Sequence, residues 1–223
     1  ELFRNIGSNI KSLSKNIVSL IKSFSLIALK VATISVGMAA VGGALIANST
    51  KQFREEQTKL NSAFSAAGAT AKEASQAYNG LFRFLGESSR SVESANHLAK
   101  ITTNTQHLAE WTTICQGIYA TFGDSLPIES LTEAANETIR VSKVTGVMAD
   151  ALNWAGVSED AFNAQLEKTT SLTEREALVR RTLMGLYQNA AAIYEQNNKA
   201  IIAQNEAQAR LDKTMARIGQ QTQ

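Results

Sequence analysis

The chain has 223 residues, of which 44% are hydrophobic and 19% charged, and it contains one proline and one cysteine. A single cysteine argues against a disulfide framework and a cysteine-built metal site, and a single proline leaves few points where a helix must stop, so an almost entirely α-helical protein is expected. The net charge is only +2, but residues 1–60 carry eight Lys or Arg against three Glu, an excess that suits an anionic surface such as lipid headgroups or phosphates. Because the first residue is Glu1, we expect an internal segment of a longer polypeptide.

Residues 1–49 form the first predicted element, in which apolar residues recur at alternating steps of three and four. Such a 3.5-residue repeat keeps one edge of a helix facing a partner helix, so it predicts a coiled coil and self-association. Isoleucine in both core layers favours three or more strands, and we expect a homotrimer. The predicted oligomerisation seam consists of Phe3, Ile6, Ile10, Leu13, Ile17, Leu20, Phe24, Ile27, Val31, Ile34, Met38, Val41 and Leu45.

From residue 23 onward the same helix becomes apolar on every side, and residues 31–47 carry no charge. At about 1.5 Å per residue this run is slightly shorter than the roughly 30 Å hydrocarbon layer of a bilayer. It is either a conditional membrane segment or an oligomer core sheathed by other proteins, and the two states can alternate in time. We favour the second, because a lone lipid-facing span needs no continuous heptad register. The expected membrane contacts are Lys22, Lys30, Val36, Gly37, Gly43 and Ile46.

Residues 50–195 are predicted to form a body of seven or eight short helices, since no segment alternates apolar and polar residues as a strand does. Capping boxes at Thr70–Glu73 and Ser171–Glu174 mark two helix starts. Pro127 fits the first position of a helix, and residues 88–91 are expected to form a polar turn. The predicted helices span residues 51–67, 70–85, 92–101, 106–122, 128–144, 147–154, 158–168 and 171 onward.

The last of these helices is expected to run on as far as Ile218. Residues 196–223 would then be a polar C-terminal helix that continues the last helix of the body. This segment is rich in Gln, Asn and Ala, which predicts either a solvated helix or a weak coiled coil.

Few residues suggest chemistry. His97 and His107 lie on different predicted helices without companion ligands, so each is expected to be an ordinary surface or core histidine rather than a metal ligand. Glu55 with Glu56, and Glu174 with Glu176, look like paired acids, but acidic residues at helix starts are what the helix dipole favours. We therefore expect no enzyme, no cofactor and no metal.

Two further patterns have structural readings that we prefer. Glu176 and Arg180 form an ordinary i,i+4 pair, and Arg180 with Arg181 could touch phosphate but are expected to face solvent. The Trp154-Ala-Gly156 pattern also occurs in a turn of small secreted helical-hairpin proteins. An aromatic side chain plugging a helix end, followed by glycine, is the preferred interpretation.

The segment GVMADALNWAGVSEDAFNAQLEKTTSLTEREALVRRTLMGLY, at residues 146–187, follows FGDSLPIESLTEAANETIRVSKVTG. Together they resemble the core region of tail tape measure proteins of tailed phages, prophages and phage-tail-like bacteriocins. The resemblance covers roughly residues 50–195, and its most specific part is the order ALNWAG, SEDAFN, TEREALVRRTLMGLY.

The resemblance implies a long helical protein, several copies of which bundle in the tail lumen and set the tail's length. It implies tail-tube and tail-tip or baseplate-hub proteins as partners, residence in the virion tail, and contact with DNA and the host membrane during ejection. Some members of that family carry peptidase or muramidase modules, but no residues here match one. The alternative hypothesis is a membrane-anchored helical signalling or secretion-system protein with a permanent span at residues 23–47.

Overall fold

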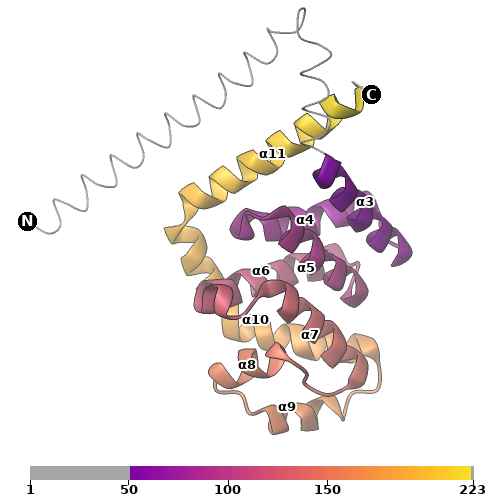
Figure 1. The fold of residues 1–223 in the computed structure, drawn as a ribbon. Coiled ribbons are helices and arrows are strands. Elements are labelled where there is room, and N and C mark those ends of the chain that lie inside the picture. The colour runs from indigo at the N-terminus through magenta and orange to yellow at the C-terminus, as the bar shows by residue number, and fades with distance from the viewer. Residues whose placement is uncertain (1–50, 222–223) are drawn as a thin grey trace, which may run out of the picture.

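The computed structural model describes residues 51–221, and it describes the side chains of residues 51–217. In that range the chain forms nine α-helices and one short 3-10 helix, without a strand, which confirms the all-α prediction. The elements are α3 (Lys51–Ala66), α4 (Ala71–Leu85), α5 (Ser88–Ile101), α6 (Thr105–Phe122), η1 (Gly123–Ser125), α7 (Ile128–Val141), α8 (Val147–Trp154), α9 (Glu159–Leu166), α10 (Leu172–Asn197) and α11 (Lys199–Gln221) (Figure 1).

The predicted arm lies outside the described residues. All thirteen seam residues, from Phe3 to Leu45, and the six expected membrane contacts, from Lys22 to Ile46, belong to it. Among residues 51–221, no helix combines the length and the apolar composition needed to cross a bilayer.

Both predicted capping boxes begin helices. At the start of α4, the Thr70 hydroxyl accepts a hydrogen bond from the N–H of Lys72, and the Glu73 carboxylate accepts one from the N–H of Thr70 at 2.9 Å. At the start of α10, the Ser171 hydroxyl accepts from the N–H of Glu174 at 3.2 Å. The Glu174 carboxylate in turn accepts from the N–H of Thr170, one residue before the cap, at 2.7 Å. Side chains therefore satisfy amide groups that a helix start leaves unpaired.

Three predicted boundaries are wrong. Residues 88–91 are the first turn of α5 rather than a polar turn, and the Ser88 hydroxyl donates a hydrogen bond to Glu56 of α3. The contact with α3 thus stabilises a helical turn that local propensity does not favour. Pro127 precedes α7 as its cap instead of occupying the first helical position. Helix α7 ends at Val141, three residues early, because Ser142 adopts a left-handed conformation with φ of 60°.

The long C-terminal helix is divided at Asn198, where the backbone leaves helical geometry. Arg83 of α4 lies beside both halves: its guanidinium is 2.6 Å from the Glu195 carboxylate of α10 and 3.6 Å from the Glu206 carboxylate of α11. The Asn205 side chain also donates to the carbonyl of Arg83 at 3.1 Å. As a result, α11 turns back along α4 and α3 rather than extending the line of α10 (Figure 1).

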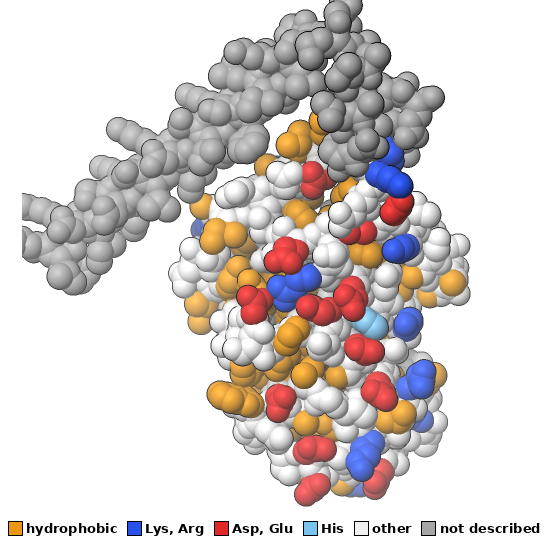
Figure 2. Space-filling view, in the orientation of Figure 1, with side chains coloured by type: hydrophobic (Ala, Val, Ile, Leu, Met, Phe, Trp, Pro, Cys, Tyr) orange, Lys and Arg blue, Asp and Glu red, His pale blue; other side chains and the backbone are white. Residues whose placement is uncertain are grey.

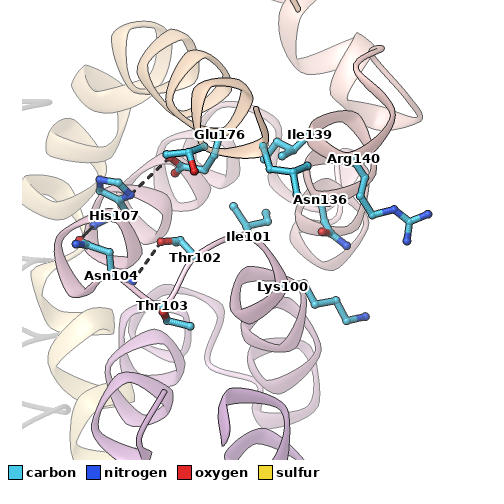
Figure 3. Close-up of a pocket in the computed structure, with 12 residues that line it drawn as sticks. Lys100, Ile101, Thr102, Thr103, Asn104, His107, Asn136, Ile139, Arg140 and Glu176 are labelled. Atoms are coloured by element: carbon cyan, nitrogen blue, oxygen red, sulfur yellow. Dashed lines mark hydrogen bonds and ion pairs between the residues drawn. The ribbon is translucent and has the colours of Figure 1, made fainter. Parts of the chain in front are cut away.

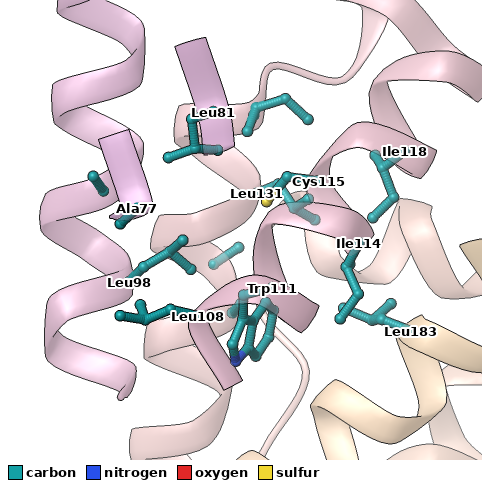
Figure 4. Close-up of a cluster of buried hydrophobic side chains, with 14 of the residues drawn as sticks. Ala77, Leu81, Leu98, Leu108, Trp111, Ile114, Cys115, Ile118, Leu131 and Leu183 are labelled. Atoms are coloured by element: carbon teal, nitrogen blue, oxygen red, sulfur yellow. The ribbon is translucent and has the colours of Figure 1, made fainter. Parts of the chain in front are cut away.

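Helix α6 is the centre of the body. Figure 4 shows it passing through the hydrophobic core between Leu98 of α5 and Leu183 of α10. Trp111 and Cys115 of α6 are fully buried in this core. Because α6 is covered on several sides, its sequence is apolar beyond a single stripe.

The two ends of the described chain lie together. Helix α3 begins, and helix α11 finishes, at the same end of the body (Figure 1). A shallow hollow there is lined by Phe53 and Arg54 from α3 and by Lys213 and Arg217 from α11. The chain therefore enters and leaves the body side by side.

Candidate functional site

A buried group of polar side chains joins α6 to α10. The indole N–H of Trp111 donates to Oε1 of Glu176 at 2.9 Å, and Nε of Arg180 donates to the same oxygen at 2.7 Å. Glu176 is only 4% exposed and Arg180 only 6%. Moving a carboxylate or a guanidinium out of water costs free energy. The ion pair and its hydrogen bonds must therefore offset the desolvation of both charges.

His107 and Glu110, from the first turns of α6, complete this polar network. Arg180 is paired through Nη1 with the Glu110 carboxylate, and its Nη2 lies 3.2 Å from Nε2 of His107. A guanidinium can only donate, so Nε2 of the imidazole accepts in this contact and Nδ1 carries the ring N–H. That nitrogen lies 3.5 Å from Oε2 of Glu176.

The electrostatics of the network stabilise its charged forms. Burial alone would raise the pKa of Glu110, but hydrogen bonds from Gln106 and Arg180 outweigh it and lower that pKa. Burial likewise opposes the charge of Arg180, yet Glu176 and Glu110 together raise the Arg180 pKa above its ordinary value. Arg180 therefore remains a cation held between two carboxylates.

A pocket of about 610 Å³ opens directly over this network (Figure 3). Its walls come from the ends of α5 and α7, the start of α6 and the first turns of α10. Glu176 and His107 belong to both the network and the pocket wall. The lining residues are Lys100, Ile101, Thr102, Thr103, Asn104, His107, Asn136, Ile139, Arg140, Leu172, Thr173 and Glu176.

The geometry suits binding better than proton transfer. Nε2, the imidazole nitrogen that a general base would present to a substrate, faces Arg180. Oε1 of Glu176 already accepts two hydrogen bonds, whereas its Oε2 has only the long contact with His107. The pocket thus offers one under-used carboxylate oxygen and a firmly oriented imidazole.

The sequence interpretation of Glu176 and Arg180 is half right. They are an i,i+4 pair, but a buried one tied to a second helix, and Arg180 does not face solvent. Arg181 is exposed as expected. A signal was present in the sequence: His107, Glu110 and Trp111 share one face of a helix by their spacing of three and four, which could have indicated a polar cluster on an otherwise apolar helix.

The other candidate residues remain apart. The ring of His97, on α5, is half-buried, and this burial lowers its pKa. Glu55 forms an exposed ion pair with Lys51, and Glu56 accepts a hydrogen bond from Ser88. Within the range that the structure describes, no three His, Cys, Asp or Glu side chains gather as metal ligands.

The prediction for Trp154 is half right. Gly156 follows the helix with φ of 80°, and the N–H of Val157 returns to the carbonyl of Leu152 at 3.0 Å, as expected of a glycine-terminated helix. The indole does not plug the helix end, because Trp154 is 77% exposed. Its ring stands edge-on to Phe122 with the centroids 5.7 Å apart.

These observations define an all-α protein whose one buried charged network lies, among the described residues, beneath a small pocket. On the face drawn in Figure 2, acidic and basic side chains are interspersed rather than separated by sign. Comparison with family models, curated proteins and solved structures finds no match to the chain.

Proposed function

We propose that this chain is a segment of a tail tape measure protein, which sets the length of a phage-type tail and scaffolds the tail tube. The resemblance of residues 146–187 supports the proposal. The turns on which it depends lie between helices in the structure: Gly156 closes α8, Ser158 caps α9 and Ser171 caps α10. Partners would be further copies of the chain, tail-tube proteins and tail-tip or hub proteins.

The observation that best fits this role is the adjacency of the body's two ends. Because the chain enters and leaves the body at neighbouring points, the body would project from the side of a rod-like helical segment. The rod itself would then be the arm, with its seam from Phe3 to Leu45 aligning three copies. A helix adds about 1.5 Å per residue, so such an arm converts residue number directly into length.

The proposal is tested by lengthening the arm in register. Duplicating residues 3–44 adds 42 residues, which is six heptads, and at about 1.5 Å per residue should lengthen the tail by roughly 63 Å. Tail lengths would be measured by electron microscopy of particles from cells carrying the duplication in the chromosomal gene. The matched control is a flexible Gly/Ser insert of equal length after Asp124, in the exposed 3-10 helix η1 that connects α6 to α7.

The control should leave tail length unchanged, because the ends of the body remain adjacent whatever loop is enlarged. Particles that incorporate the duplicated arm and keep their original tail length would contradict the ruler role.

The second candidate function is a membrane-anchored signalling or secretion-system protein, which is favoured by the uncharged run at residues 31–47. Membranes from producing cells would be washed with alkaline carbonate. A permanent span remains in the membrane until detergent is added, whereas a tail component sediments with tail particles without detergent.

A further inference from the structure

The pocket over the polar network has chemically distinct ends. Figure 3 shows Lys100, Asn136 and Arg140 on one side and His107 with Asn104 on the other. Ile101 lies between the two sides. A volume of about 610 Å³ is within the range of pockets that take small organic ligands.

The side of the pocket that carries Lys100, Asn136 and Arg140, which we call the outer side, is cationic. Lys100 is in the last turn of α5 and Arg140 is in the last turn of α7, and neither side chain makes an ion pair with a described residue. Asn136, one turn before Arg140, adds an amide group between them. A carboxylate placed there would gain two cations and a hydrogen-bond donor.

The middle of the pocket is apolar and part of it is exposed. Ile101 and Ile139 form the wall, and Leu172 adds a side chain that is 55% exposed. Burying that leucine against an aliphatic ligand would remove apolar surface from water.

The opposite side, near His107, which we call the inner side, offers a hydrogen-bond acceptor. Oε2 of Glu176 lies in low-dielectric surroundings with only the 3.5 Å contact to His107. A ligand N–H or ammonium group reaching this oxygen would satisfy it, and the neighbouring Arg180 and Trp111 hold the carboxylate in a fixed orientation.

From these three regions we infer that the pocket binds a small aliphatic peptide through its C-terminal carboxylate. The carboxylate lies between Lys100 and Arg140, the aliphatic side chains contact the isoleucine and leucine wall, and an N–H group at the opposite end donates to Glu176. This inference does not depend on the proposed tail function.

The test uses the dipeptide Leu-Leu and the 223-residue chain with Trp154→Phe, which leaves Trp111 as the only tryptophan of that chain. Because the Trp111 indole donates to Glu176, its fluorescence should report an occupied pocket. We expect a saturable change with Leu-Leu, and binding about tenfold weaker or worse with the C-terminal amide Leu-Leu-NH₂.

The double variant Lys100→Gln/Arg140→Gln should weaken Leu-Leu binding about tenfold and leave the amide unaffected. The matched control, Lys143→Gln/Lys168→Gln, removes two exposed lysines outside the pocket and should change neither. Thermal melting establishes that each variant is folded.

Three results would overturn the inference. One is the absence of any fluorescence change with Leu-Leu up to about 10 mM. A dissociation constant above about 10 mM corresponds to a binding free energy weaker than about 3 kcal/mol. Another is an equal loss of Leu-Leu and amide binding in the double variant, which would mean that the two cations do not recognise the carboxylate. The third is displacement of Leu-Leu by inorganic phosphate at equal concentration, which would reduce the site to an unselective anion contact.

Discussion

Gly117 of α6 lies against the backbone of Tyr187 of α10. A β-carbon added to this glycine would stand 2.1 Å from the Tyr187 carbonyl oxygen, far inside van der Waals contact. The same two helices carry the buried network of Trp111, Glu176 and Arg180. Their close approach at one glycine therefore sets the geometry on which the network depends.

Replacing Gly117 with Ala should be strongly destabilising. The clash is with main-chain atoms, which cannot rotate away, so we expect a loss of about 3 kcal/mol or more in the free energy of unfolding. Urea denaturation followed by circular dichroism measures it. Gly185→Ala on α10 is the matched control, because nothing lies within 4 Å of its added β-carbon. That change should stabilise by about 0.5–1 kcal/mol, and equal effects at the two glycines would contradict the helix contact.

Arg180→Met should destabilise the protein because it leaves Glu176 buried without its cation. The expected loss in the free energy of unfolding is about 3–5 kcal/mol, the usual cost of breaking a buried charge pair from one side. Arg181→Met changes the exposed neighbour and should alter stability by no more than about 0.5 kcal/mol. Urea denaturation of both variants measures the two free energies of unfolding. Similar midpoints for the two would show that Arg180 is solvated.

The packing of α11 onto the body can be tested with adjacent isoleucines. Ile202 is 5% exposed, whereas Ile201 is 49% exposed. Ile202→Ala should therefore cost about 2–4 kcal/mol, and Ile201→Ala well under about 1 kcal/mol. Hydrogen exchange of α11 amides provides a second measurement, with faster exchange expected only for Ile202→Ala. Equal stability and equal hydrogen exchange in the two variants would indicate that α11 does not pack on the body.

Stability should fall with acid. The pKa of Glu110 is lowered from its ordinary value of 4.5, since the hydrogen bonds from Gln106 and Arg180 outweigh the effect of burial. The folded state therefore binds fewer protons than the unfolded chain, and this contribution is complete above about pH 4.5 and lost as the pH falls through the folded pKa. Urea midpoints between pH 7 and pH 3 should drop less for Glu110→Gln. Glu167→Gln, at an exposed site, should follow the parent protein.

Cys115 should be unreactive until the core opens. Burial raises the pKa of its thiol to about 12, so at pH 8 almost no thiolate is present or accessible. Ellman's reagent should not label the native protein within an hour, and should label it within seconds in concentrated urea. The Gly117→Ala variant should react faster at low urea because α6 opens more readily. Rapid labelling of the native parent would contradict the central position of α6.

Local sequence accounts for most of the helices. The Thr70 box, the Ser171 cap and Gly156 are short-range signals, because each satisfies amides or carbonyls within a few residues. Helix boundaries that depend on contacts with distant residues were not predicted, because these short-range signals carry no information about such contacts. Residues 88–91 are helical where Ser88 meets Glu56, and the last helix breaks at Asn198 where Arg83 binds Glu195 and Glu206.

The candidate site was decided only by the tertiary structure. By itself, the sequence determined the all-α fold of the described residues and the spacing that places Glu176 near Arg180, since both depend on residues within a few turns. Burial of that pair and its connection to His107 and Glu110 required α6 to cross α10 at Gly117. Helix periodicity specifies which residues share a face of a helix. Packing between segments distant in the chain decides which faces meet, and therefore which charged side chains are buried.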